Sequence, residues 1–202
     1  MKKQIRAFLL CFLAAACFWT GSLIVDRQKL RDQIIRLHVV AVSDSQEDQT
    51  VKLQVKDAVV EYLHSAMADI SHIDQAKAYV RDNLPQLQAI ANETLVSLGQ
   101  EPSAVATFCK ESFGKRIYDT FTLPSGVYDS LRITIGEGAG KNWWCVVFPT
   151  LCVSATTEEL EAVAAGAGFS DSLTGALSQG AGYEVRFFFL DMLGKLENLL
   201  WE

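Results

Sequence analysis

The sequence predicts an α+β fold in which an N-terminal strand and two or three helices pack on a mostly antiparallel sheet, preceded by an export or transmembrane helix. Three observations predict it: an uncharged stretch over residues 7–25, apolar residues at helical spacing over 46–98, and four closely spaced strand-like segments between 104 and 148. Helices gathered in one half of a chain and strands in the other are typical of the α+β class.

The N-terminus has the pattern of an export segment. Lys2, Lys3 and Arg6 precede residues 7–25, which carry no charge. A basic start followed by an apolar run is typical of a signal peptide, and this run is also long enough to span a bilayer as a helix. The positive-inside rule leaves the N-terminus in the cytoplasm and exports the rest of the chain. We therefore expect residues 1–26 to be a signal peptide or membrane anchor and 27–202 to form a single exported domain.

The predicted exported domain is acidic. Beyond residue 26 it keeps 15 of the 18 Lys and Arg residues and 23 of the 24 Asp and Glu residues, a formal charge of −8. This balance argues against binding to nucleic acid or to anionic lipid surfaces. At about 175 residues the domain is large enough to bury a core without a dense disulfide framework.

The first half of the domain predicts a strand and then helices. After a polar spacer at 28–33, residues 34–42 are rich in β-branched side chains and predict a strand. Ser45 and Asp48 resemble a capping box, which predicts a helix over about 46–67 with an Asp48–Lys52 ion pair on its outer face.

A second run of apolar residues at helical spacing, the second stripe, begins near residue 73. Ser71 and Asp74 repeat the capping pattern there. Pro85 cannot occupy a helix interior without a kink, so either this helix bends or a new one begins with Asp82 or Asn83 as its N-cap. The stripe continues to Gly99, which closes it.

The second half predicts strands at 104–109, 116–121, 128–135 and 143–148, in an antiparallel meander. Gly138 and Gly140 make residues 137–142 a tight connection between the last two strands. Both faces of 143–148 are apolar, which predicts a central strand, and Pro149 ends it.

The C-terminal region predicts a short acidic helix over 157–165 and a mobile Gly/Ser-rich segment at about 166–182. Residues 183–190 are apolar and predict either a last strand or the start of a C-terminal helix.

Three cysteines lie beyond the export segment, so an oxidising compartment would leave one thiol over. Cys145 and Cys152 are close enough to bridge past Pro149. We expect them to form a disulfide with Cys109 free and buried, and pairing of Cys109 with either one is the alternative. By the loop-entropy model such a short ring would contribute roughly 2 to 3 kcal/mol.

No catalytic or cofactor-binding motif is present: the chain has no nucleophile elbow, zinc-protease helix, phosphate loop or aspartic-protease triplet. We expect no catalytic residue, metal or cofactor, and His38 is interpreted as a structural residue of the first strand. Residues 43–49 form a polar cluster that could bind an ion, although a helix cap is the favoured interpretation. Trp143 and Trp144 alternate to opposite faces, and either could be a glycan platform, a partner contact or core.

Two pairs of segments together resemble the stage II sporulation protein R family. RLHVVAVSDSQEDQ (36–49) and KLQVKDAV (52–59) are similar to the opening of that family, and LPSGVYDSLRI (123–133) and GKNWWCVVFPTLC (140–152) to its second half. The segments keep the family's order after a similar export segment.

Two positions depart from the family pattern: Val42 stands where Asn is typical and Ser125 where Ala is usual. Motif positions that match are Ser43, Asp44, Ser45, Asp48, Asn142, Trp143, Trp144, Cys145 and Cys152. We expect a partner-binding surface formed from the seven that are not cysteines: Ser43, Asp44, Ser45, Asp48, Asn142, Trp143 and Trp144.

The resemblance implies a signalling protein that is not an enzyme. Members are made in the forespore and exported into the space between the two septal membranes. There they activate a membrane-embedded aspartic protease, stage II sporulation protein GA, which processes the precursor of mother-cell sigma factor E.

Two other functions remain possible from the residues. An exported enzyme would gather His38 with a carboxylate and a nucleophile in a polar cleft. An exported cell-wall or glycan-binding module would expose Trp143 or Trp144 on a flat groove. A signalling module would instead show a broad surface near residues 137–142.

Overall fold

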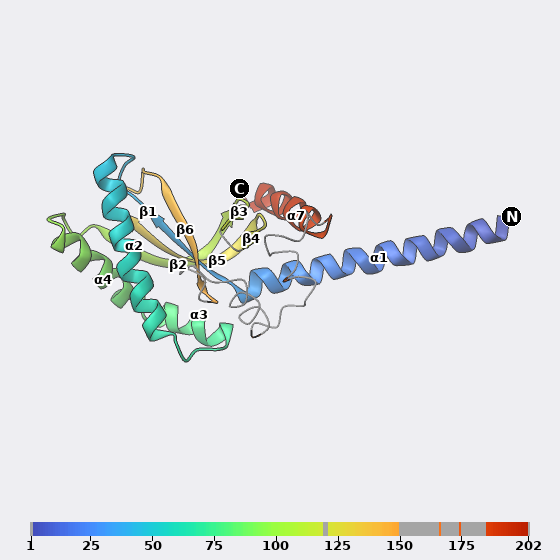
Figure 1. The fold of residues 1–202 in the computed structure, drawn as a ribbon, viewed down its shortest axis with the longest axis horizontal. Coiled ribbons are helices and arrows are strands. Elements are labelled where there is room, and N and C mark those ends of the chain that lie inside the picture. Colours follow the sequence, from blue (N-terminus) through green and yellow to red (C-terminus); the bar gives the residue numbers. More distant parts are fainter. Residues whose placement is uncertain (1, 119–120, 150–165, 167–173, 175–184, 202) are drawn as a thin grey trace.

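Residues 2–118, 121–149, 166, 174 and 185–201 are described by the computed structural model. A sheet with helices packed on it forms the body of the protein, and one long helix leads away from it to the N-terminus (Figure 1). The elements are α1 (Lys2–Gln33), β1 (Ile35–Val40), α2 (Gln46–Ala66), α3 (Ile73–Asp82), α4 (Leu84–Ser97), β2 (Ala104–Phe113), β3 (Arg116–Ile117), β4 (Thr122–Leu123), β5 (Gly126–Ile135), β6 (Asn142–Phe148) and α7 (Val185–Trp201).

The main sheet has four strands in the order β2-β5-β1-β6. β1 lies parallel to β5 and antiparallel to β6, while β2 lies antiparallel to β5. β3 and β4 pair with each other as a separate two-stranded sheet. The predicted α+β class with a mostly antiparallel sheet is confirmed.

The predicted meander is wrong, because β1 inserts between β5 and β6. Leu37 of β1 pairs with Leu131 on one side and with Cys145 on the other. The strand at 143–148 is therefore an edge strand, and β1, buried at all six positions, is central. The spacing of apolar residues depends only on neighbours in sequence. It therefore cannot predict that a strand from the start of the domain lies between two later strands.

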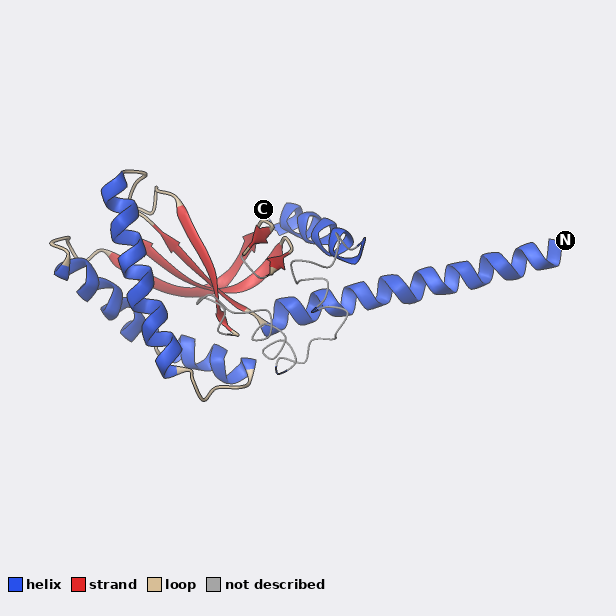
Figure 2. Cartoon of the chain, in the orientation of Figure 1, coloured by secondary structure: helices blue, strands red, loops and turns tan. Residues whose placement is uncertain are grey.

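Helices α2, α3 and α4 cover one face of the sheet (Figure 2). Val59 and Leu87 from these helices join Leu37 and Leu131 in one buried apolar cluster. α2 occupies the predicted range and begins after Ser45, whose Oγ accepts a hydrogen bond from the Asp48 N–H at 3.1 Å. The predicted helix and its N-cap are confirmed.

The chain starts a new helix at Pro85. Asn83 is the N-cap of α4, and Pro85 lies in its first turn, where an N–H has no intrahelical partner to lose. α3 begins after His72 without a side-chain cap, so the capping role predicted for Ser71 is wrong. Gly99, with φ of +73°, ends the stripe as predicted.

The opposite face of the sheet packs on the last turns of α1 and on α7. Leu30, Phe113, Tyr128 and Leu190 belong to this second apolar cluster. Residues 185–190 begin α7, which confirms the helical interpretation of that segment. The predicted helix at 157–165 and the Gly/Ser-rich segment at 166–182 lie outside the described residues, except for Gly166 and Thr174.

α7 sits directly on the turn before β5. A Cβ at Gly194 would lie 1.6 Å from the Ser125 carbonyl oxygen, so only glycine permits this approach. Asp191 accepts hydrogen bonds from the Ser125 N–H at 2.9 Å and from its hydroxyl at 2.8 Å. Ser125 therefore has a structural role here.

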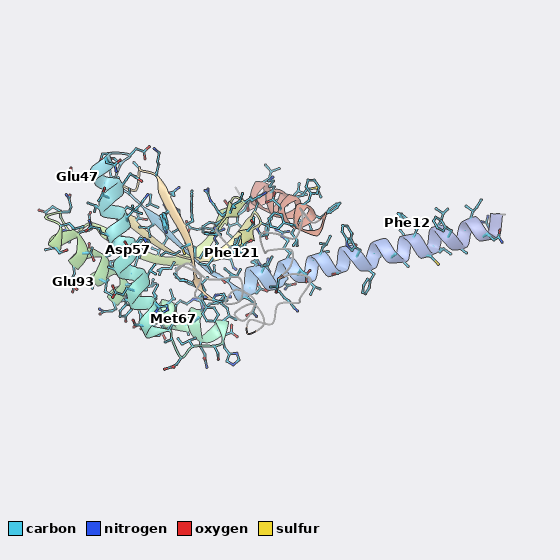
Figure 3. The ribbon with its side chains drawn as sticks, in the orientation of Figure 1. Phe12, Glu47, Asp57, Met67, Glu93 and Phe121 are labelled. Carbon is cyan, nitrogen blue, oxygen red and sulfur yellow. The ribbon has the colours of Figure 1, made fainter. Side chains whose placement is uncertain are left out.

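α1 is one unbroken helix through Gln33, and the segment expected as a polar spacer is part of it. Leu23 and Leu30 are buried against the body of the protein. By length and composition, the part of α1 from Gln4 to Gln33 could cross a membrane. Phe12, in the apolar stretch, lies well away from the body (Figure 3).

Candidate functional site

The loop between β1 and α2 and the connection between β5 and β6 lie side by side. The Gly140 N–H donates to the Ala41 carbonyl at 2.9 Å, and the Ala139 N–H donates to the Val42 carbonyl at 3.2 Å. A Cβ at Gly140 would lie 2.2 Å from the Ser43 carbonyl oxygen, so a glycine is required for the two segments to approach. We call the surface formed here, by Ser43, Asp44, Ser45, Asp48, Lys141 and Asn142, the strand–helix rim.

Hydrogen bonds fix the first half of the rim. The Ser43 hydroxyl donates to the Asp48 carboxylate and accepts from the Ser45 N–H at 3.1 Å. Ser45 in turn caps α2. The cap interpretation favoured for the cluster at 43–49 is thus confirmed for these three residues.

Asp44 joins the two halves of the rim. Its carboxylate accepts from the Lys141 N–H at 2.7 Å and lies 3.9 Å from the Lys141 ammonium. Lys52 reaches the same place from α2 and donates to the Lys141 carbonyl at 3.0 Å and to Gln49 at 2.6 Å. The predicted Asp48–Lys52 pair is therefore not formed.

Lys52 is buried beneath the rim. Burial lowers the pKa of its ammonium, and the charge of Lys141 adds to that effect, while Asp44 opposes it. Lys52 acts as a hydrogen-bond donor that ties α2 to the β5–β6 connection.

The outer surface of the rim is open to solvent. Asp44, Ser45, Lys141 and Asn142 are exposed, and the Asn142 side chain makes no hydrogen bond with another described residue. Trp143 follows on β6, 37% exposed, with the Lys56 ammonium 5.1 Å from its ring centre. The structure thus brings together all the predicted partner-binding residues except Trp144.

Trp144 lies on the other face of the sheet. Its ring stacks on His38 at 5.7 Å between centroids, and the Arg116 guanidinium lies 3.6 Å above it. Because residues alternate along β6, Trp143 and Trp144 serve opposite faces, as predicted.

This second face also holds a charged cluster that sequence reasoning missed. His38 Nδ1 lies 3.1 Å from the Glu111 carboxylate, which also binds Arg132 at 3.1 Å. Burial alone would raise the pKa of Glu111, but the hydrogen bond from His38 and the Arg132 charge hold it below its usual value. The sequence did hold one sign of this cluster. Arg36 and His38 alternate with apolar residues in the strand-like segment 34–42, which indicates that one face of that strand carries charge.

The same face bears on the enzyme alternative. His38 does meet a carboxylate, and the Ser130 hydroxyl lies on the same face by register with Arg36. Among the described residues, however, no serine or cysteine hydrogen bonds with His38, whose Nε2 is buried without a partner. A serine nucleophile is activated by such a contact with its base, and His38 makes none in the described part of the chain. The described residues also contain no group of three or more His, Cys, Asp and Glu that could hold a metal ion.

The cysteines follow the prediction only in part. Cys109 is free, which removes the alternative pairings, but it is exposed, so its predicted burial is wrong. It projects from β2, an edge strand. Cys145 is buried on β6. Cys152 lies outside the described residues, and the Cys145–Cys152 disulfide stays a prediction.

Comparison with known proteins gives one family. The family described as stage II sporulation protein R matches residues 31–158. The chain is 42% identical over 121 residues to "Stage II sporulation protein R" of Bacillus subtilis (strain 168), across 60% of this chain and 54% of that protein. The match thus spans about half the length of that relative. No solved structure matches the chain.

Proposed function

The chain belongs to the stage II sporulation protein R family, and from this membership we propose that it is an exported signalling protein of endospore formation. In this proposal the forespore makes the protein and exports it into the space between the septal membranes. It activates the membrane-embedded aspartic protease stage II sporulation protein GA, which then processes the precursor of sigma factor E. α1 provides the export signal or the membrane anchor.

The observation that carries the proposal is the strand–helix rim. Two segments singled out by the family resemblance, far apart in sequence, are joined there by the Asp44–Lys141 contact. Hydrogen bonds hold their backbone, while Asn142 and Trp143 stay exposed. A surface whose shape is fixed before binding loses little conformational freedom when a partner docks.

The position of the rim supports contact with a protein in a facing membrane. Glu47, in the first turn of α2 beside the rim, lies at the end of the body remote from Phe12 of α1 (Figure 3). If α1 occupies one membrane, the rim points away from it, across the intermembrane space.

Activation in this proposal needs no catalysis by this chain. The domain binds the active arrangement of the protease more tightly than the idle one, and the difference in affinity shifts the population. A tenfold difference corresponds to about 1.4 kcal/mol, which a few contacts of the rim could supply.

The alternative is an exported cell-wall or glycan-binding module. Trp143 favours it, because its ring is 37% exposed. Trp144 does not add to such a platform, because Arg116 and His38 lie against its ring. A single exposed ring with Lys56 beside it makes a small glycan surface, so we favour the signalling function.

The test is co-expression of this chain, the protease and the sigma factor precursor in a host that does not sporulate, with precursor cleavage as the readout. Cleavage is expected only when this chain is present, and Asn142→Ala is expected to reduce it while the chain remains folded and exported. The matched control is Asp69→Ala, an exposed residue in the α2–α3 connection. Cleavage that does not depend on this chain contradicts the proposal, and so does an absence of cleavage when the chain is folded and exported. Either result would make glycan binding the favoured function.

A further inference from the structure

Arg36 is a fully buried cation on the sheet face away from helices α2 to α4. It has no exposed surface, and its guanidinium lies 4.0 Å from the ring centre of Phe113 and 5.3 Å from that of Tyr128. One nitrogen, Nη2, donates to the Tyr118 hydroxyl at 2.9 Å. The other two, Nε and Nη1, are buried and have no hydrogen-bond partner in the described part of the chain.

Arg116 brings a second guanidinium to the same place. It stacks on Trp144, and its Nε is also buried without a partner. Burial lowers the pKa of Arg116, and the next largest cause is the positive charge of Arg36, so the two cations act on each other. Arg116 is only half-buried, and solvent therefore reaches this side of the pair.

The carboxylate on the same face is engaged elsewhere, because Glu111 contacts His38 and Arg132. Asp129 lies on the opposite, helix-covered face and pairs with Lys77 and Lys110. Among the described residues, no ion pair includes Arg36 or Arg116. Two like charges with unused donors in an apolar setting are unfavourable unless an anion joins them.

We infer that Arg36 and Arg116, with the Tyr118 hydroxyl beside them, form a binding site for a carboxylate. Guanidinium donors suit a planar carboxylate in geometry and charge. A singly charged carboxylate also loses less hydration than a phosphate on entering a site walled by Phe113 and Trp144. The ligand enters from the Arg116 side and reaches Arg36 beneath it.

The site is distinct from the strand–helix rim and does not rest on the proposed signalling function. The rim belongs to the ends of β1, β5 and β6, whereas Arg116 belongs to the separate β3–β4 sheet. The carboxylate can come from a small metabolite or from an acidic side chain of a protein, and the experiment separates these sources.

The experiment uses the full chain in detergent micelles with arginine labelled by nitrogen-15. Potassium acetate replaces potassium chloride at constant ionic strength, and the Nε–H resonances are followed by NMR. The resonances of Arg36 and Arg116 are expected to shift along one saturable curve. Arg116→Gln is expected to weaken that affinity at least tenfold. At ten times the dissociation constant, acetate should raise the unfolding midpoint by about 3 to 6 °C.

Arg132 is the matched control, because its guanidinium lies on the same face and already binds Glu111. A saturable shift confined to Arg36 and Arg116 supports the site. A shift of equal size at Arg132 indicates an adventitious ion only and overturns it. Saturation by phosphate without saturation by acetate, or no saturable shift with either, also overturns it.

A second arm measures the affinity of two terminally blocked peptides. One contains a single Glu, and the other has Gln in its place. Tighter binding of the Glu peptide than of acetate identifies a protein side chain as the source. Equal affinity identifies a free carboxylate, and binding of the Gln peptide as tight as the Glu peptide contradicts the site. The Arg36→Met variant, checked for an intact amide spectrum, should lose the response at Arg116. If it does not fold, Arg116→Gln carries the same test.

Discussion

On one face of the sheet β1 presents Leu37 and Val39 to the helices, and on the other it presents Arg36 and His38 to rings and a carboxylate. All four side chains are buried. The first face is an ordinary apolar core. The second buries charge, which costs free energy unless the charge is paired and hydrogen-bonded. The helix-covered face therefore holds the fold, whereas the other face carries the charged groups that we propose bind a carboxylate.

The largest expected difference in stability is between substitutions at two adjacent residues of β1, Leu37 and Arg36. Leu37→Ala removes a fully buried side chain from the helix-covered face and is expected to cost about 2 to 5 kcal/mol. Arg36→Met, equally buried on the other face, is expected to change stability by only about 1 kcal/mol or less, because it also removes a desolvated charge. Urea unfolding of the full chain in detergent measures both. Equal losses would show that the two faces do not differ.

Gly140→Ala tests the contact that holds the two halves of the strand–helix rim. A Cβ there would meet the Ser43 backbone at 2.2 Å, so the loops must move apart, at an expected cost of about 1 to 3 kcal/mol. Gly114→Ala is the control, because a Cβ at that position meets nothing within 4 Å. Urea unfolding compares the variants, and similar stability for both would contradict the close approach.

Ser45→Ala removes the N-cap of α2 and is expected to cost about 1 kcal/mol. Ser71→Ala serves as the control, because α3 has no side-chain cap. Thermal unfolding followed by circular dichroism suffices to rank them. A larger loss of stability in Ser71→Ala than in Ser45→Ala would contradict the assignment of Ser45 as the N-cap.

The free energy of unfolding at acidic pH tests the contacts of Glu111 on the charged face, and here we expect the smallest effect. The pKa of Glu111 is held below its usual 4.5, so its contribution is present above that value and is lost as pH falls through the lowered pKa. Glu111→Gln should therefore flatten the fall in unfolding free energy below about pH 4.5. Glu137→Gln, at an exposed turn, is the control. An unchanged acid slope in Glu111→Gln would show that the contacts with His38 and Arg132 contribute nothing.

The sequence predicted features that depend on neighbouring residues. Ser45 and the stripe of α2 are local signals, and both the cap and the helix are found. The same holds for the break at Pro85, where the sequence allows a kink or a new helix and the structure has a new helix.

Features that depend on distant pairings could not be predicted. The insertion of β1 between β5 and β6 places Leu37 beside Leu131 and Cys145, and no local pattern encodes that order. Glu111 and Arg116 were missed for the same reason, since they matter only once β2 and β3 lie near β1. For the rim, the residues were predicted from the family resemblance, but their meeting at one surface became visible only in the fold.

Site-specific photo-crosslinking tests most directly whether the strand–helix rim contacts the protease. A photoreactive amino acid replaces Asn142 in one variant and Asp69 in another, each co-expressed with the protease and the precursor. Because α2 has 21 residues, the two positions are separated by a helix of about 30 Å. We expect a covalent adduct with the protease from position 142 and none from position 69. An adduct from position 69, or none from position 142 while the precursor is still cleaved, would contradict the claim.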